Sequence, residues 1–202
     1  MMTEKDWVES IQKLLKQELT RCPSLSQEFR VSTQRKLPYA REIWAYDEKG
    51  KGFSPAEGRE KSLLYETDLL IYEEFQKQIK PRIIIEAKIA NPTTHEAIVY
   101  SHKAAQHKSV TPYLRYGIML GSMKQHHPLP GLLFRHGVNF DFMVSFKEEK
   151  LTSTEKDSLV ALINSEWGFS KQIEKMFLEN RNRNRKRYFL LQKALSLQEI
   201  DD

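Results

Sequence analysis

Residues 65–88 read YETDLLIYEEFQKQIKPRIIIEAK, and this stretch holds two apolar runs with charges set inside them. Leu, Ile and Tyr predominate in both runs, so we expect two β-strands that form a hairpin or a close antiparallel pair. Three consecutive isoleucines at 83–85 predict a central strand that is buried on both faces of a sheet. Asp68 lies inside the first run, and Glu86 and Lys88 lie inside the second. Because charged side chains are seldom buried without a partner, these three residues are the first candidates for a functional site.

The alternation of side chains along a strand places Glu86 and Lys88 on one face, roughly 7 Å apart at the backbone. If the two strands pair, Asp68 can lie beside Glu86. Two carboxylates in a partly apolar place repel each other, and their pKa values rise unless a cation lies between them. Mg²⁺ prefers carboxylate oxygens and is often held by one or two carboxylates plus substrate phosphate. The sequence therefore predicts a magnesium site, to which the backbone carbonyl of Ala87 can add another oxygen.

Lys88 would lie beside such an ion rather than bind it. Its ammonium can orient or help to deprotonate an attacking water, or stabilise the charge that builds on a phosphate oxygen. Two acids, one lysine and one ion are the parts that a phosphodiester hydrolase needs. The alternative for an E-x-K pattern is a surface salt bridge, which the apolar surroundings IIIEAKIA and the acid in the preceding run disfavour.

Thr67-Asp68, followed by Glu86-x-Lys88 at the end of a hydrophobic strand, resembles the motif of the PD-(D/E)xK nuclease superfamily. That superfamily includes most type II restriction endonucleases, and Thr67 stands where its signature has proline. The resemblance implies a central four-stranded mixed sheet flanked by helices, cleavage of DNA, and dependence on Mg²⁺, for which Mn²⁺ is expected to substitute. It also implies that Asp68 and Glu86 are metal ligands and that Lys88 is the catalytic lysine. Many members carry a further acid on the first helix, and Glu18 is the best-placed candidate.

The rest of the chain predicts helices and strands around this pair. We expect a first helix over residues 1–19 with Thr3 as N-cap, a second that starts at an N-cap Thr94 and ends before Pro112, strands at 113–121, 131–137 and 140–146, and helices from Ser153. This order favours an α/β or α+β layered domain with a mixed sheet. With the resemblance, we expect the α/β class, with a restriction-endonuclease-like core over residues 1–150 and a helical C-terminal extension over 151–202 packed on the same domain.

Several polar residues outside the motif are candidate nucleic-acid contacts. In the second helix, Ala97, Ser101, Ala104 and Ala105 form a small-residue face, and we place Tyr100, Lys103 and His107 on the opposite side. The resemblance implies that polar residues of this helix face the site, and the candidates are Lys103, Gln106 and His107. Arg115 is a candidate for phosphate contact, with a structural ion pair as the alternative.

The segment RNRNRKR, residues 181–187, adds five cations and no anion: Arg181, Arg183, Arg185, Lys186 and Arg187. Such a block predicts affinity for a nucleic-acid backbone that does not depend on base sequence. A solvated helix surface is the alternative interpretation.

Composition sets wider limits on the protein. The chain of 202 residues has the length of one domain, or of one domain with an appendage. Cys22 is the only cysteine, so the sequence holds no intrachain disulfide and no thiolate metal cluster. It has no apolar run long enough to span a membrane, and we expect a cytoplasmic protein.

Together these features predict a Mg²⁺-dependent endonuclease of double-stranded DNA, of the type II restriction kind, that works as a homodimer. Two alternatives stay open. One is a non-catalytic nucleic-acid-binding or assembly protein on the same scaffold, and the other is a DNA repair or RNA nuclease with the same three residues.

Overall fold

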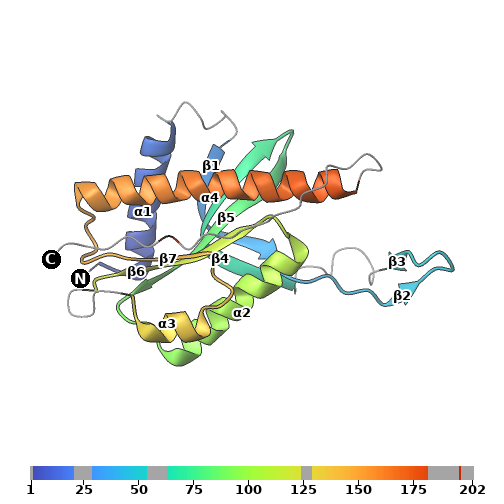
Figure 1. The fold of residues 1–202 in the computed structure, drawn as a ribbon, viewed down its shortest axis with the longest axis horizontal. Helices are drawn as coiled ribbons and strands as arrows, with labels where there is room; N and C mark the ends of the chain where they lie inside the picture. The colour runs from blue at the N-terminus through green and yellow to red at the C-terminus, as the bar shows by residue number, and fades with distance from the viewer. Residues whose placement is uncertain (1, 21–28, 54–62, 124–128, 182–195, 197–202) are drawn as a thin grey trace.

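The computed structural model describes residues 2–20, 29–53, 63–123, 129–181 and 196. The elements follow one another as shown in Figure 1: α1 (Glu4–Thr20), β1 (Phe29–Pro38), β2 (Ala45–Tyr46), β3 (Gly52–Phe53), β4 (Leu64–Phe75), β5 (Gln78–Ile89), α2 (Thr94–Val110), β6 (Arg115–Gly121), α3 (Gly131–His136), β7 (Phe142–Ser145) and α4 (Ser153–Asn180).

The main sheet has five strands in the order β1-β4-β5-β6-β7. β1, β4 and β5 pair antiparallel, whereas β5, β6 and β7 pair parallel. The predicted α/β class, with a central mixed sheet flanked by helices, is confirmed. The sheet has one strand more than the resemblance implies.

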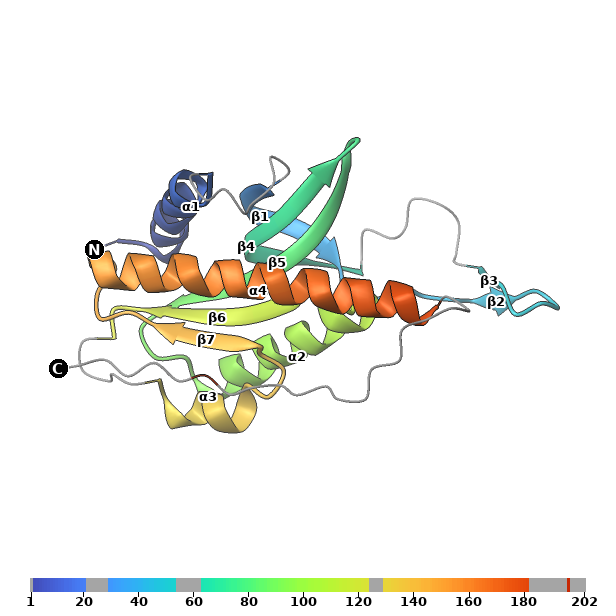
Figure 2. The ribbon, with the colours of Figure 1, turned by 45° about the horizontal axis from the view of Figure 1, so that its top comes forward.

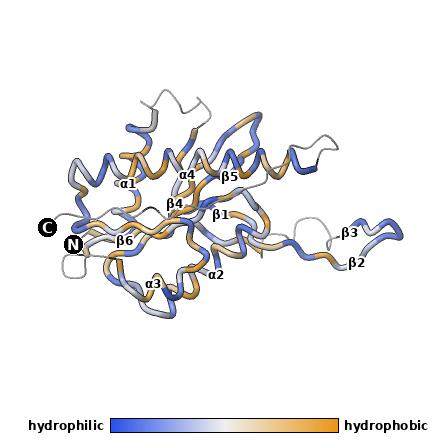
Figure 3. Tube along the Cα trace, in the orientation of Figure 1, coloured by the Kyte–Doolittle hydropathy of each residue, from blue (hydrophilic) through white to orange (hydrophobic). Residues whose placement is uncertain are grey.

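Helices cover both faces of this sheet (Figures 1 and 2). On one face α1 and α4 pack against Ile83 and Ile85, and on the other α2 packs against Ile84. All three isoleucines are fully buried, which confirms the prediction of a central strand covered on both sides. The hydrophobic colouring in Figure 3 accordingly gathers along the strands at the centre of the molecule.

β4 and β5 form the expected antiparallel pair, as a hairpin with a two-residue loop. The strands join through Gln76 and Lys77 alone, and both residues have positive φ, as a two-residue hairpin loop requires. Pro81 lies within β5, opposite Tyr72. A register shift at this point leaves Arg82 between two partner pairs, and its guanidinium contacts Ser170 and Glu174 of α4.

Local capping explains where the first two helices begin. Thr3 caps α1, because its hydroxyl accepts a hydrogen bond from the amide of Asp6. The N-cap of α2 is Thr93 and not the predicted Thr94. The Thr93 hydroxyl accepts from the amide of Glu96, and the Glu96 carboxylate accepts from the amide of Thr93, which completes a capping box.

The prediction of a strand at 131–137 is wrong, since residues 131–136 form helix α3, with Leu133 as its buried residue. A short apolar run fits a buried helical turn as well as a strand, and the sequence alone does not separate the two.

α4 lies across the sheet beside α1. Leu159, Ile163 and Trp167 recur at helical spacing and enter the same core as Trp7 of α1. Away from this body, β2 and β3 form a two-stranded arm that projects to the right in Figure 2. Within the parts of the chain described, no helix is both long and apolar enough to cross a membrane.

Candidate functional site

Asp68 and Glu86 meet at the point where β4 and β5 separate. Pairing between these strands runs from Phe75–Gln78 to Leu69–Ile85, while β4 continues to pair with β1 as far as Leu64. Asp68 and Glu86 would form the next pair. Instead, the carboxylate of Asp68 turns to the edge of β5, where Oδ2 accepts a hydrogen bond of 2.9 Å from the amide of Ala87.

We call the point between Asp68 and Glu86, where β4 and β5 separate, the notch. Glu86 is buried there and is only 1% exposed. Its Oε1 accepts a hydrogen bond from the hydroxyl of Tyr116, and its Oε2 lies 3.6 Å from Nζ of Lys103. Burial raises the pKa of Glu86 to about 7, and the negative charge of Asp68 adds to the rise. A carboxylate that is this poorly solvated and lies beside another acid is suited to bind a cation.

Lys88 lies on the same face of β5 but is held by acids from two helix starts. Its Nζ lies 2.7 Å from Oε1 of Glu96 in the first turn of α2, and 4.0 Å from Oε2 of Glu4 in α1. The hydrogen bond to Glu96 raises the pKa of Lys88, and the same bond lowers the pKa of Glu96 to about 2. Glu4 also accepts a hydrogen bond of 3.2 Å from the amide of Ile89.

Two tyrosines flank the ammonium of Lys103. Its Nζ lies 5.7 Å from the ring centre of Tyr65 and 5.4 Å from that of Tyr100, within the range of cation–π attraction. Burial raises the pKa of Tyr100 to about 12; Lys88 opposes this rise, and Glu86 and Asp68 add to it. Among the residues that the structure describes, Lys103 is the cation that forms an ion pair with Glu86.

His107 does not lie with Lys103 on an outer face of α2, and that prediction is wrong. The ring is 1% exposed, its Nδ1 lies 3.1 Å from the carbonyl oxygen of Pro38, and burial lowers its pKa to about 4. The reason is helical spacing, because His107 comes one turn after Ala104 and so continues the buried stripe of small residues. Gln106 is half-buried, and its contact with nucleic acid stays a prediction.

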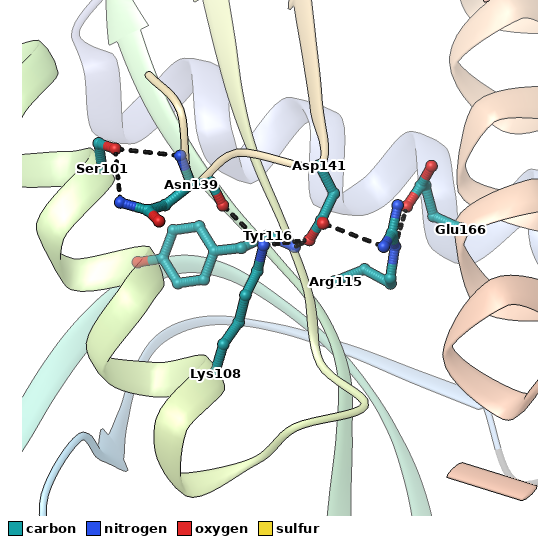
Figure 4. A network of polar contacts seen from close by, with 7 residues as sticks. All are labelled: Ser101, Lys108, Arg115, Tyr116, Asn139, Asp141 and Glu166. Atoms are coloured by element: carbon teal, nitrogen blue, oxygen red, sulfur yellow. Dashed lines mark hydrogen bonds and ion pairs between the residues drawn. The ribbon is translucent and has the colours of Figure 1, made fainter. Parts of the chain in front are cut away.

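Arg115 takes part in the polar network shown in Figure 4. Its Nε lies 2.6 Å from Oε2 of Glu166, and its Nη1 lies 3.0 Å from Oδ1 of Asp141. The other oxygen of Asp141 bonds Nζ of Lys108 and the amide of Tyr116, both at 2.8 Å. These contacts tie β6 to α2 and α4, and they support a structural ion pair for Arg115 rather than the expected phosphate contact.

The acid that α1 brings to the site is Glu4 and not Glu18. The two lie fourteen positions apart along the helix, which amounts to about 21 Å at 1.5 Å per residue. In the basic run, Arg181 follows the end of α4 and is exposed, whereas Arg183, Arg185, Lys186 and Arg187 lie outside the described residues.

Sequence reasoning did not assign Glu4, Glu96 or Tyr116 to the site. A local signal existed for Glu96, because Thr93 followed three residues later by a glutamate is the pattern of a capping box. For Tyr116 there was none, since its contact depends on the parallel pairing of β5 with β6.

The donor set suits a hard divalent cation such as Mg²⁺. Asp68 and Glu86 offer carboxylate oxygens beside the backbone of Ala87, and Mg²⁺ is commonly held by two carboxylates with water or phosphate in its other positions. No third His, Cys, Asp or Glu joins them to form a three-ligand cluster in the described ranges.

No protein-family model matches the chain, and no curated protein sequence matches it. Among solved structures, the protein is similar to the restriction endonuclease BsaWI in a pre-specific complex with DNA. The TM-score is 0.49 and the sequence identity is 9%, over 91% of this chain and 68% of BsaWI.

Proposed function

We propose that this protein is a Mg²⁺-dependent endonuclease that hydrolyses phosphodiester bonds of double-stranded DNA, of the type II restriction kind. One observation carries the proposal. Two carboxylates, the buried Glu86 and the partly buried Asp68, converge where β4 and β5 separate, and the lysine of an E-x-K pattern follows two residues later on the same face. The resemblance of Asp68, Glu86 and Lys88 to the PD-(D/E)xK motif names the reaction.

In this proposal Asp68, Glu86 and the carbonyl of Ala87 hold the ion. When bound, Mg²⁺ supplies Lewis acidity toward a phosphate oxygen and makes a bound water easier to deprotonate. Tyr116 fixes the carboxylate of Glu86 through its hydroxyl, and the amide of Ala87 fixes that of Asp68. Glu96 holds Lys88, whose ammonium would orient the water or stabilise charge on the phosphate.

Duplex DNA would contact the protein beyond the notch. Lys103 and Gln106 of α2 remain candidate contacts to the scissile region, and the cations at Arg181 and at 183–187 remain candidates for backbone affinity. We further propose a homodimer, because a two-fold axis would present one notch to each strand of a palindromic target.

The test is cleavage of duplex DNA by the purified protein. Phage-length DNA supplies nearly all short recognition sequences, so cutting with Mg²⁺ or Mn²⁺ should give discrete fragments, and EDTA should stop it. Asp68→Asn, Glu86→Gln and Lys88→Met should abolish cutting and leave DNA binding intact in a gel-shift assay. Lys49→Met, which changes an exposed residue of the β2–β3 arm, is the matched control.

Three other outcomes separate the alternatives. Gel-shift binding without cleavage under either metal would indicate a non-catalytic nucleic-acid-binding protein. Cleavage restricted to RNA or single strands would indicate the other kind of nuclease. If the protein neither cleaves nor binds any nucleic acid, the proposal is refuted.

A further inference from the structure

Lys103 occupies a specific place beside the two carboxylates. Its ammonium lies 3.6 Å from Oε2 of Glu86, and its side chain is 22% exposed. The rings of Tyr65 and Tyr100, at 5.7 and 5.4 Å from the ammonium, favour a cation at this point. The contact therefore joins a cation that two aromatic rings stabilise to a buried acid.

The charges of the site explain why this contact forms. Asp68 and Glu86 carry two negative charges when both are ionised, and Lys103 supplies one positive charge. Lys88 does not make up the difference, because its ammonium is bonded to Glu96 and lies beside Glu4. Lys103 thus acts as the counter-ion of Glu86, at a distance longer than that of a direct charge-assisted hydrogen bond.

We propose that a divalent cation and the ammonium of Lys103 compete for Glu86, so that metal binding releases Lys103 toward a phosphate oxygen of the substrate. This inference rests on the metal site of the proposed function. Two positive charges within a few ångströms of one carboxylate oxygen repel each other strongly where water is scarce. The long, partly exposed side chain of Lys103 lets its ammonium move aside while α2 stays in place.

The experiment measures binding of Mn²⁺ alone, without DNA, by isothermal titration calorimetry. Lys103→Met keeps most of the apolar stem and removes the charge, so it should bind Mn²⁺ about tenfold more tightly than the unchanged protein. Lys103→Arg keeps the charge and should stay within about twofold. Lys49→Met removes a distant cation and controls for the net charge of the protein.

Thermal unfolding supplies a second readout that needs no activity. In EDTA, Lys103→Met should melt below the unchanged protein, because Glu86 loses its counter-ion. Saturating Mn²⁺ should remove this difference, since the metal then supplies the charge. Lys103→Gln also removes the charge but keeps a polar end. If the Met variant does not fold, Mn²⁺ binding and thermal unfolding are measured with Lys103→Gln instead.

The results separate this inference from the nuclease proposal. Unchanged or weaker Mn²⁺ binding by both neutral variants, in a protein that still cuts DNA, overturns the competition and leaves the nuclease intact. Absence of Mn²⁺ binding in the unchanged protein overturns both. The competition is established if the neutral variants bind Mn²⁺ more tightly while Lys103→Arg and Lys49→Met do not, and if Mn²⁺ removes the difference in melting temperature between the neutral variants and the unchanged protein.

Discussion

Two groups of acids, each with one buried glutamate, lie on opposite faces of the same strand pair, β4 and β5. Asp68 and Glu86 face α2, with the ammonium of Lys103 at 3.6 Å from Glu86. Glu73 faces α4, where Arg82 bridges it to Glu174 through contacts of 2.9 and 2.5 Å. Lys171 and Lys80 add further ion pairs to Glu73 and Glu174, at 3.1 and 2.8 Å.

The two groups differ in how well charge is matched. Burial raises the pKa of both Glu73 and Glu174, but hydrogen bonds and charge from Arg82 and the lysines outweigh it, so both values fall below the ordinary range. Burial also raises the pKa of Glu86, and here the acid at Asp68 adds to the rise, which reaches about 7. Cations of the chain neutralise Glu73 and Glu174. Asp68 and Glu86 keep an excess of negative charge, which a bound cation would neutralise.

The largest expected effect tests this difference through activity. Glu86→Gln should lower the rate of Mg²⁺-dependent DNA cleavage by about a thousandfold, which corresponds to about 4 kcal/mol of transition-state stabilisation. Glu73→Gln removes a charge from the other face and should leave the cleavage rate per folded molecule unchanged. The measurement is the rate of plasmid DNA cleavage under conditions where both variants are folded. Equal losses of rate in the two variants would contradict the assignment of Glu86 to the active site.

The next effect tests the matched group through stability. Arg82→Met leaves Glu73 and Glu174 without their shared guanidinium in a buried place, and we expect a loss of about 3 kcal/mol in the free energy of unfolding. Arg30→Met removes the exposed pair to Glu74 and should cost less than about 1 kcal/mol. Urea denaturation measures both, and equal losses would show that burial of the Arg82 group is unimportant.

The raised pKa of Glu86 predicts an unusual pH dependence of stability. Between its ordinary pKa of 4.5 and about 7, the folded protein keeps a proton that the unfolded chain has released. The contribution of Glu86 to stability should therefore fall as pH rises across this range, by about 3 kcal/mol at most. His107, whose pKa is lowered to about 4, contributes in the opposite direction below its ordinary pKa of 6.5. Urea unfolding in EDTA at pH 5 and pH 8 isolates the contribution of Glu86 as the difference between the unchanged protein and Glu86→Gln, because His107 is common to both. Parallel slopes would contradict the raised pKa.

The sequence predicted the paired acids because the features that place them are local. Side-chain alternation fixed Glu86 and Lys88 on one face, and the apolar runs predicted the strands that carry them. The contact of Asp68 with the amide of Ala87 depends on where the hairpin turns. That position was not predictable, since the loop consists of Gln76 and Lys77, which carry no glycine or asparagine signal.

The surroundings of the acids depend on contacts between distant parts of the chain, and there the sequence was less informative. Glu4 reaches Lys88 because α1 packs beside the end of β5. At this end Gly121 of β6 pairs with Ile89 of β5, and the ring of Trp7 lies too close to Gly121 for a side chain at that position. Tyr116 reaches Glu86 because β6 runs parallel to β5. His107 was misplaced because a four-residue step from Lys103 and a three-residue step from Ala104 fit different faces equally well.

The smallest expected effect comes from a comparison of two capping boxes with the same geometry, at the starts of α2 and α4. Glu96 caps α2 with one carboxylate oxygen and holds Lys88 with the other, whereas Glu155 caps α4 and its second oxygen accepts from the amide of Lys147. Glutamine can still serve the cap in both places, so Glu96→Gln and Glu155→Gln should melt within a few degrees of the unchanged protein.

Only Glu96→Gln loses the ion pair to Lys88, and it should lower kcat for DNA cleavage about tenfold with little change in KM. If Lys88 acts without a fixed position, both variants will cut at the unchanged rate, and Glu96 will be a capping residue alone. If both lose activity in step with their melting temperature, the effect comes from the helix starts and not from the lysine. A selective loss of kcat in Glu96→Gln would show that the beginning of α2 positions the lysine of the site.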